Sequence, residues 1–219
     1  MSAHHHPDDA TLMSYAAGAL PESFETLVAC HLQFCTRCKQ RIREAEDIGA
    51  ALLEAAEPTT NRGRDQFFAQ LMQEPDIDPM MDSATAASAA VTRQHAFPAP
   101  LQQLLKNGDT GLAWRRLVPG IQQIRMETRD GGLRLLRIQP GMSIPIHTHH
   151  GSEMTLILDG SYSDELGRFK PGDVADLDPT VEHQPITDGN VPCICLVATD
   201  APMKFQGLLP KLLQPFVGL

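Results

Sequence analysis

The stretch His31-Leu32-Gln33-Phe34-Cys35-Thr36-Arg37-Cys38 decides how the first part of the chain folds. If it is helical or nearly so, His31 and Cys35 lie one turn apart and Cys38 returns to the same face, so three metal-binding groups share one stripe. Zinc is commonly held by four His or Cys groups, and the upstream run His4-His5-His6 offers the fourth. The sequence therefore predicts a zinc site of His6, His31, Cys35 and Cys38, whereas the Cys-x2-Cys pair taken alone fits a redox pair equally well.

Helical patterns surround this stretch. Apolar residues recur at helical spacing between Asp8 and Gly18, between Pro21 and His31, and from Cys38 to about Glu57, where Pro58 ends the pattern. A short fourth helix would carry an apolar stripe that fits either a core or a contact surface for a partner; its members are Phe67, Phe68, Leu71 and Met72. We expect an all-α bundle over residues 1–73, a size at which bound zinc supplies much of the stability.

Residues 74–100 differ in composition from both flanking parts. Four prolines, Pro75, Pro79, Pro98 and Pro100, bracket a tract of Ser, Ala and Thr at residues 83–90. Because such a segment has few side chains that can pack in a core, it is predicted to be an interdomain linker.

Short apolar or alternating runs with Gly, Pro and Asp between them fill the rest of the chain, which predicts an antiparallel β barrel over residues 101–219. Inside this region lies the pattern Gly141-x5-His147-x-His149-x3-Glu153-x6-Gly160. On a strand His147 and His149 point to the same side, and Glu153 can return to that side from the next strand. With His183 these residues predict a second metal site, suited to zinc, iron, manganese or nickel.

These two patterns resemble a known family. His6 with His31-x3-Cys35-x2-Cys38 resembles the zinc-binding domain of bacterial anti-sigma factors, and the pattern from Gly141 to Gly160 resembles the first cupin motif. Their combination resembles the ChrR-type members, which join a zinc domain to a cupin barrel. The resemblance implies a two-domain α + β protein that sequesters an extracytoplasmic-function (ECF) sigma factor through its N-terminal half. It also implies release in response to singlet oxygen or organic hydroperoxides, sensed through the cupin half.

The second cupin motif is only partly present. Gly167, Pro171-Gly172-Asp173 and His183 resemble its elements, but Pro179-Thr180-Val181 stands where a Pro-x-Gly turn is usual. The departure leaves metal binding expected but argues against a standard cupin enzyme pocket. Nearby, Cys193 and Cys195 face the same side of a strand, where they are either core residues or oxidisable thiols close to the metal.

Composition narrows the function further. The formal charge of −9 and the pI near 5.4 argue against a nucleic-acid surface. No apolar run reaches the roughly 18 residues that span a bilayer and no signal peptide is evident, so the expected location is the cytoplasm. Five cysteines, an odd number, suit metal binding or redox sensing better than a disulfide framework.

Two classes of function remain open. The favoured one is a regulator without catalytic residues, whose partner is an ECF sigma factor; a weak homodimer through the cupin domain is left open. The alternative is a cupin metalloenzyme, a dioxygenase or isomerase, with the zinc domain as a targeting module. The regulator is favoured because the sequence shows no acid/base pair beyond the four cupin ligands.

Overall fold

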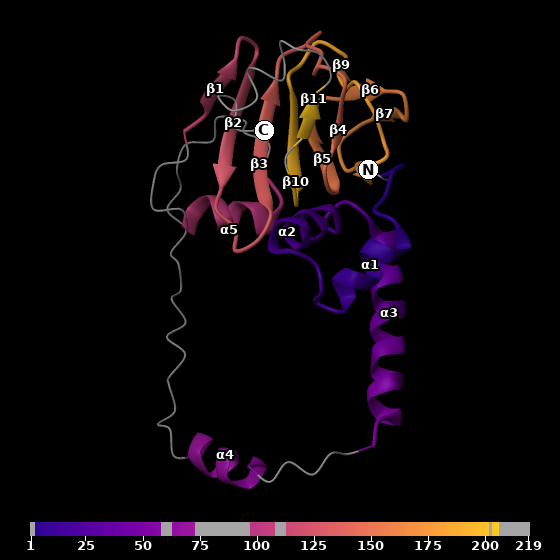
Figure 1. Cartoon of the computed structure of the whole chain (residues 1–219), viewed down its shortest axis with the longest axis vertical. Helices are drawn as coiled ribbons and strands as arrows, with labels where there is room; N and C mark the ends of the chain where they lie inside the picture. The colour runs from indigo at the N-terminus through magenta and orange to yellow at the C-terminus, as the bar shows by residue number, and fades with distance from the viewer. Residues whose placement is uncertain (1–2, 58–62, 73–96, 108–112, 202, 206–219) are drawn as a thin grey trace. The chain divides into compact units, whose positions relative to one another are not determined.

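A group of helices precedes a set of antiparallel strands in the computed structural model, which describes residues 3–57, 63–72, 97–107, 113–201 and 203–205 (Figure 1). The described helices are α1 (Asp9–Ala16), α2 (Glu22–His31), α3 (Thr36–Ala55), α4 (Arg64–Leu71) and α5 (Ala99–Asn107). The strands are β1 (Arg115–Val118), β2 (Ile121–Met126), β3 (Gly132–Ile138), β4 (His147–His149), β5 (Glu153–Asp159), β6 (Tyr162–Asp164), β7 (Gly167–Phe169), β8 (Val174–Leu177), β9 (Ile186–Thr187), β10 (Cys193–Thr199) and β11 (Met203–Phe205).

The first helix begins and ends where the sequence predicts. The carboxylate of Asp8 accepts a hydrogen bond from the Thr11 amide at 2.6 Å, which caps the free amides of the first turn of α1. Gly18 follows the helix with a φ of 63°, a conformation that glycine adopts without steric cost.

The stretch from His31 to Cys38 forms a helix–turn–helix rather than the continuous helical stripe expected from its spacing. α2 ends at His31, the chain turns through Leu32 to Cys35, and α3 begins at Thr36. The Phe34 amide donates to the His31 carbonyl at 2.8 Å, so the turn tightens immediately after the helix. The turn separates the two helices while keeping His31 close to both cysteines.

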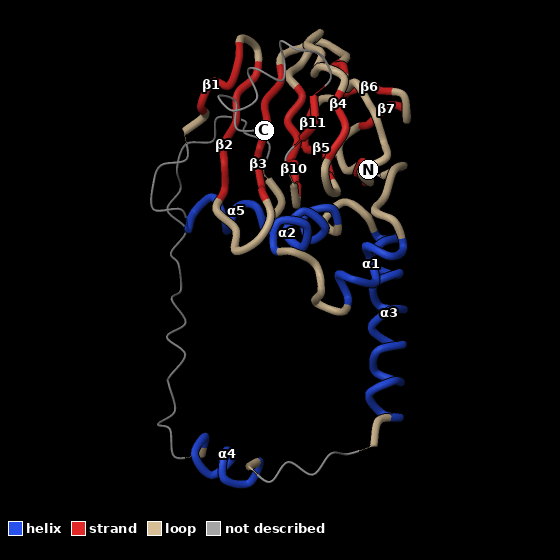
Figure 2. Tube along the Cα trace, viewed as in Figure 1, coloured by secondary structure: helices blue, strands red, loops and turns tan. Residues whose placement is uncertain are grey.

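The strands form three sheets that together have the expected cupin architecture (Figure 2). Among the described residues, the strand pairing does not close into one continuous barrel. The largest sheet has the order β1-β2-β3-β10-β5-β8, and smaller sheets pair β11 with β4 and β7-β6-β9. Isolated bridges join His147 to His183 and Ser143 to Ile186. These bridges bring the segment that carries His183 next to β4.

Both faces of the large sheet are buried. On β10, Cys193, Cys195 and Val197 belong to the interior cluster, whereas Ile194, Leu196 and Ala198 belong to the cluster that includes the helices. α2 packs against β10, β5 and β3 and also against α5, and both helices lie along one end of these strands in Figure 1. Leu27 and Val28 of α2 are fully buried, and so is Leu101 of α5.

Packing does not follow the expected three-part division of the chain. Residues 1–49 and 95–219 form one compact unit, and residues 50–94 form a second. The first unit arises because the apolar face of α2 lies on the sheet. The packing groups the first helices with the β half. Whether the chain folds as separate units over residues 1–73 and 101–219, with a linker at 74–100, therefore stays a prediction.

The sequence did not predict α5. Pro98 and Pro100 suggested a linker, but proline is compatible with the first turn of a helix, where its missing amide is not needed. The alanine-rich tract at 83–90 and the apolar tail from 206 onward lie outside the described residues. Among the described helices, none is both long and apolar enough to cross a membrane.

Candidate metal centres

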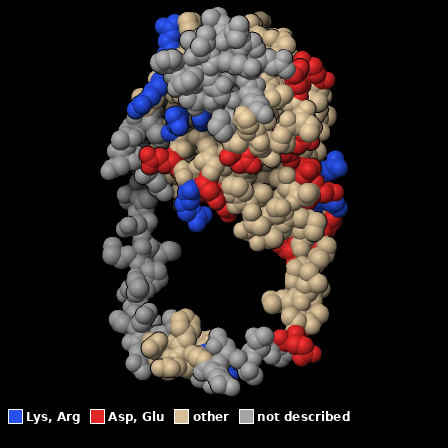
Figure 3. Space-filling view, in the orientation of Figure 1, with Lys and Arg blue, Asp and Glu red and all other residues tan. Residues whose placement is uncertain are grey.

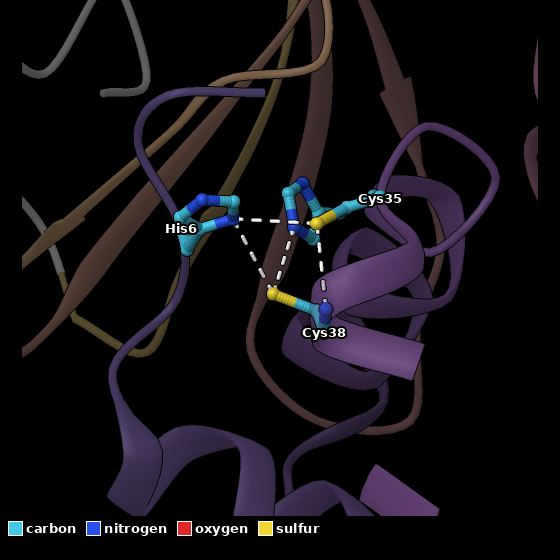
Figure 4. A group of neighbouring side chains, drawn as sticks. His6, Cys35 and Cys38 are labelled. Atoms are coloured by element: carbon cyan, nitrogen blue, oxygen red, sulfur yellow. Dashed lines mark hydrogen bonds between the residues drawn. The ribbon is translucent and has the colours of Figure 1, made fainter. Parts of the chain in front are cut away.

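The N-terminal centre is assembled from the segment before α1 and from the junction between α2 and α3. His6 precedes α1, His31 is the last residue of α2, Cys35 lies in the turn, and Cys38 lies in the first turn of α3. Figure 4 shows the side chains of His6, Cys35 and Cys38 pointing toward one another. The His31 Nε2 atom lies 3.3 Å from Cys38 Sγ, and His6 Nδ1 lies 3.4 Å from Cys35 Sγ and 3.5 Å from Cys38 Sγ.

These distances fit a tetrahedral zinc ion. With Zn–S near 2.3 Å and Zn–N near 2.05 Å, tetrahedral angles place neighbouring ligand atoms about 3.3 to 3.8 Å apart. The four ligand atoms all lie within 4.8 Å of one another. His31, Cys35 and Cys38 are buried, which suits a structural site from which water is excluded. The predicted set is therefore brought together as one cluster.

The protonation states in this centre follow from its burial. Burial lowers the pKa of His31 to about 4, so the imidazole is neutral at pH 7 and can bind a metal. Its Nδ1 donates a hydrogen bond to the carbonyl of Gly172 at 2.9 Å, which leaves the lone pair on Nε2, the atom that faces Cys38. Burial raises the pKa of Cys38 to about 12, so a metal must displace the thiol proton to bind there.

A second centre lies inside the β half. His147 and His149 lie on β4, Glu153 begins β5, and His183 is bridged to His147; all four are buried. The Nε2 atoms of His147 and His183 lie 3.1 Å apart, and His149 Nε2 lies 3.2 Å from Glu153 Oε2. The ligand atoms of all four residues lie within 4.8 Å of one another. Three imidazoles and one carboxylate suit a transition metal.

The tautomers of this centre also favour a cation. His147 Nδ1 donates to the carbonyl of Pro145 at 2.9 Å, and His183 Nδ1 donates to the carboxylate of Asp164 at 3.0 Å. In the neutral rings both Nε2 atoms then carry lone pairs, and these face each other. Such an arrangement is repulsive unless a cation or a proton lies between them. The bond from His183 to Asp164 is the carboxylate–histidine pairing that commonly orients a metal-binding imidazole.

Buried polar atoms without hydrogen-bond partners also indicate a bound cation in this centre. Both ring nitrogens of His149 and the Oε2 atom of Glu153 are buried without a well-directed hydrogen bond to any described residue. Burial favours the protonated form of Glu153, but the adjacent imidazoles hold its pKa below the ordinary value. An unsatisfied carboxylate oxygen in a buried site is costly, and a bound metal would remove that cost.

A small cavity of about 30 Å³ adjoins this centre. Its lining includes His147, Glu153 and His183, together with Tyr162 and Cys195. This volume holds one or two water molecules or a molecule of similar size. Cys193 and Cys195 are both buried, and the hydrogen bond that the Cys195 thiol donates to Cys193, together with burial, raises the pKa of Cys195 well above its ordinary value. Cys195 is therefore a neutral thiol at pH 7 in this state.

The sequence identified all eight clustered residues but missed their supports. Asp164 orients His183, Gly172 contacts His31, and Asp173 contacts the backbone just before His6. Asp164 lies in no recognisable motif. Gly172 and Asp173 belong to the partial second cupin motif, but the motif did not indicate that they contact the N-terminal segment. His150, which follows His149 directly, is exposed and lies outside the cluster.

Comparisons with known proteins agree with this architecture. Residues 108–202 match a family described as the ChrR cupin-like domain. Over 217 residues, which are 99% of both chains, the sequence is 37% identical to anti-sigma-E factor ChrR of Cereibacter sphaeroides. The crystal structure of Rhodobacter sphaeroides SigE in complex with the anti-sigma ChrR matches 91% of this chain and 100% of that one, with a TM-score of 0.71 and 32% identity.

Proposed function

The chain belongs to the ChrR family of anti-sigma factors, and we propose that it sequesters an ECF sigma factor through its metal-bearing N-terminal half. One observation carries the proposal: the similarity extends along 99% of the chain to an anti-sigma factor, and a solved complex of such a protein with a sigma factor matches this fold. Family membership favours a regulator over the metalloenzyme alternative. The proposed location is the cytoplasm, where sigma factors and RNA polymerase meet.

Exposed apolar side chains on two helices support a protein partner. In α3 only Cys38 and Ile42 are buried, whereas Ile48, Leu52 and Leu53 are 54%, 69% and 78% exposed. On α4, Phe67 and Phe68 are 58% and 57% exposed. Groups of large exposed apolar side chains usually mark a surface that another protein covers. Of the two roles open for the α4 stripe, these exposures favour the contact surface.

Zinc is the metal proposed for the N-terminal centre, because two thiols and two imidazoles in a closed, buried tetrahedron are typical of structural zinc. It would hold the segment before α1, the end of α2 and the start of α3 together, and it would thereby present α3 to the sigma factor. The cupin centre could take zinc, iron, manganese or nickel through His147, His149, Glu153 and His183.

The cupin half is proposed to be the sensor. Singlet oxygen or an organic hydroperoxide would act at the buried centre, with Cys193 and Cys195 as candidate oxidisable groups, since Cys195 lines the cavity beside three of the ligands. Changing the complex from 99% bound to 99% released requires a difference of about 5.5 kcal/mol between the two states. Replacing both cysteines with alanine should blunt release by oxidant in a sigma-dependent reporter, and an unchanged response would make them core residues only.

Co-expression with the host's ECF sigma factors tests the proposal. The full chain is expected to retain one of them in a pull-down assay and to inhibit its transcription in vitro. The double variant Phe67→Ala, Phe68→Ala should weaken retention at least tenfold, because it removes two large contact groups. Leu166→Ala, which removes a 49% exposed apolar side chain from the turn between β6 and β7, is the matched control and should retain the sigma factor. Equal loss in both variants, or loss in neither, would contradict the proposed contact surface.

A further inference from the structure

The turn after β7, Lys170-Pro171-Gly172-Asp173, belongs to the β half but contacts the N-terminal metal centre. The Gly172 carbonyl accepts the buried hydrogen bond from His31 Nδ1 at 2.9 Å. Gly172 has a φ of 95°, and a Cβ atom there would lie 3.1 Å from the side chain of Phe34. Glycine therefore meets two requirements at this position, a left-handed backbone and close approach to the ligand-bearing turn.

Asp173 contacts the chain just before His6. Its Oδ1 atom accepts hydrogen bonds from the amides of His4 at 2.6 Å and His5 at 3.1 Å, and the Val174 amide donates to the His5 carbonyl at 3.1 Å. Asp173 is only 2% exposed. Its other oxygen accepts from the Lys170 amide at 2.9 Å, so the carboxylate also closes its own turn. Although burial opposes ionisation, these amide donors lower the pKa of Asp173, which is therefore charged at pH 7.

The turn is itself anchored to the interior of the β half. The Gly172 amide donates to the Ile157 carbonyl at 2.9 Å, and the Ile157 amide donates to the Asp173 carbonyl at 3.0 Å. Ile157 lies on β5 and is fully buried. The atoms that contact His31, His4 and His5 are thus held by a strand of the large sheet rather than by an exposed loop.

From these contacts we propose that the turn 170–173 is the outer support of the N-terminal metal centre. Gly172 fixes the ring of His31 in the orientation and tautomer that present Nε2, and Asp173 fixes the backbone that carries His6. Two of the four ligands are therefore positioned by the β half. The inference rests on the proposed zinc occupancy of this centre, and it is independent of whether the chain binds a sigma factor.

The proposal predicts that zinc affinity at the N-terminal centre depends on a cupin residue that is not a ligand. Loss of an outer partner of a ligand typically weakens metal binding 10- to 100-fold. Asp173→Ala should therefore lower affinity at this centre about 10- to 100-fold. Asp173→Asn keeps an acceptor oxygen for the amides but loses the charge, and it should lower affinity about fivefold, because hydrogen bonds to a charged acceptor are stronger.

Cobalt binding by the full-length chain tests this directly. Because cysteine ligands occur in the N-terminal cluster and not in the cupin cluster, thiolate-to-cobalt charge-transfer absorption reports on the first centre alone. Zinc competition against bound cobalt and against a chelator then gives its affinity. Asp188→Asn is the matched control, since that carboxylate lies in the same half and accepts hydrogen bonds from Ser161, Ser163 and Arg168 instead. Metal content of the cupin centre serves as an internal reference.

The expected result is weaker binding in both Asp173 variants, with Asp188→Asn and the cupin metal unchanged. Unchanged affinity in Asp173→Asn and Asp173→Ala would overturn the role of Asp173. If Asp173→Ala does not fold, the zinc affinity of Asp173→Asn alone decides the role of Asp173. Nitrogen NMR of the histidine rings in the unaltered zinc-loaded chain decides the role of Gly172: His31 should carry its proton on Nδ1 and zinc on Nε2, and the opposite assignment would overturn it.

Discussion

His31 Nδ1 lies 2.9 Å from the carbonyl oxygen of Gly172, although the two residues are 141 positions apart in the sequence. This hydrogen bond joins a predicted metal ligand of the helical half to a turn of the β half. It leaves Nε2 free to face Cys38 and, with the burial of α2 on the sheet, links residues 1–49 to residues 95–219 within one compact unit.

Removal of a thiol ligand should empty the N-terminal centre. Cys35→Ala or Cys38→Ala should lower the metal content by one zinc per chain and reduce helicity, since the metal joins the segment before α1 to α2 and α3. Metal analysis and far-ultraviolet circular dichroism measure both effects. Cys30→Ala is the control, because Cys30 is buried but lies outside the cluster. Full metal content in the Cys35 and Cys38 variants would exclude the proposed ligands.

The cupin centre should lose its metal independently. His147→Ala, His149→Ala, Glu153→Ala and His183→Ala should each abolish a second metal equivalent while the cobalt–thiolate signal of the first centre persists. Asp164→Asn should weaken this second site about 10- to 100-fold, because it alters the partner that orients His183. The exposed His150→Ala variant should bind normally. The assignment fails if the unaltered chain takes up no second metal under any loading condition.

Zinc affinity at the N-terminal centre should rise with pH. The pKa of Cys38 is raised to about 12, so zinc must displace its proton at neutral pH, whereas His31, whose pKa is lowered to about 4, is already neutral. Each displaced thiol proton makes the apparent affinity about tenfold greater per pH unit between roughly pH 6 and pH 8. Chelator competition at several pH values measures the slope. A flat profile would mean that the thiols do not bind the metal.

Stability should depend strongly on the apolar face of α2. Leu27 is fully buried between α2 and the sheet, so Leu27→Ala should lower the free energy of unfolding by about 2 to 5 kcal/mol. Leu52→Ala, on the exposed part of α3, should change it by less than about 0.5 kcal/mol. Urea denaturation of the full chain compares the two. Equal effects would show that α2 does not pack on the sheet in solution.

Residue spacing predicted which candidate ligands the fold brings together, because metal sites require particular side chains at particular spacings. His31, Cys35 and Cys38 needed only to be close in sequence, and His147, His149 and Glu153 followed a strand–turn–strand pattern. Spacing could not show that the chain turns between His31 and Cys35, because a helix and a helix–turn–helix place these residues similarly. Composition likewise suggested two separate halves. The apolar face of α2 could not correct this expectation, because its sequence pattern is the same whether the helix packs on other helices or on a sheet. The contact between His31 and Gly172 joins distant segments through a backbone carbonyl, so although position 172 needs glycine, the residue type does not show which side chain the carbonyl binds.

The metal-loaded chain is proposed to hold an ECF sigma factor. Size-exclusion chromatography with light scattering on the full chain and its host's ECF sigma factors tests it most directly, before and after zinc is removed by a chelator. We expect a complex with one sigma factor that dissociates on zinc removal and re-forms when zinc is restored. Separate elution of the zinc-loaded chain from every ECF sigma factor of the host would contradict it.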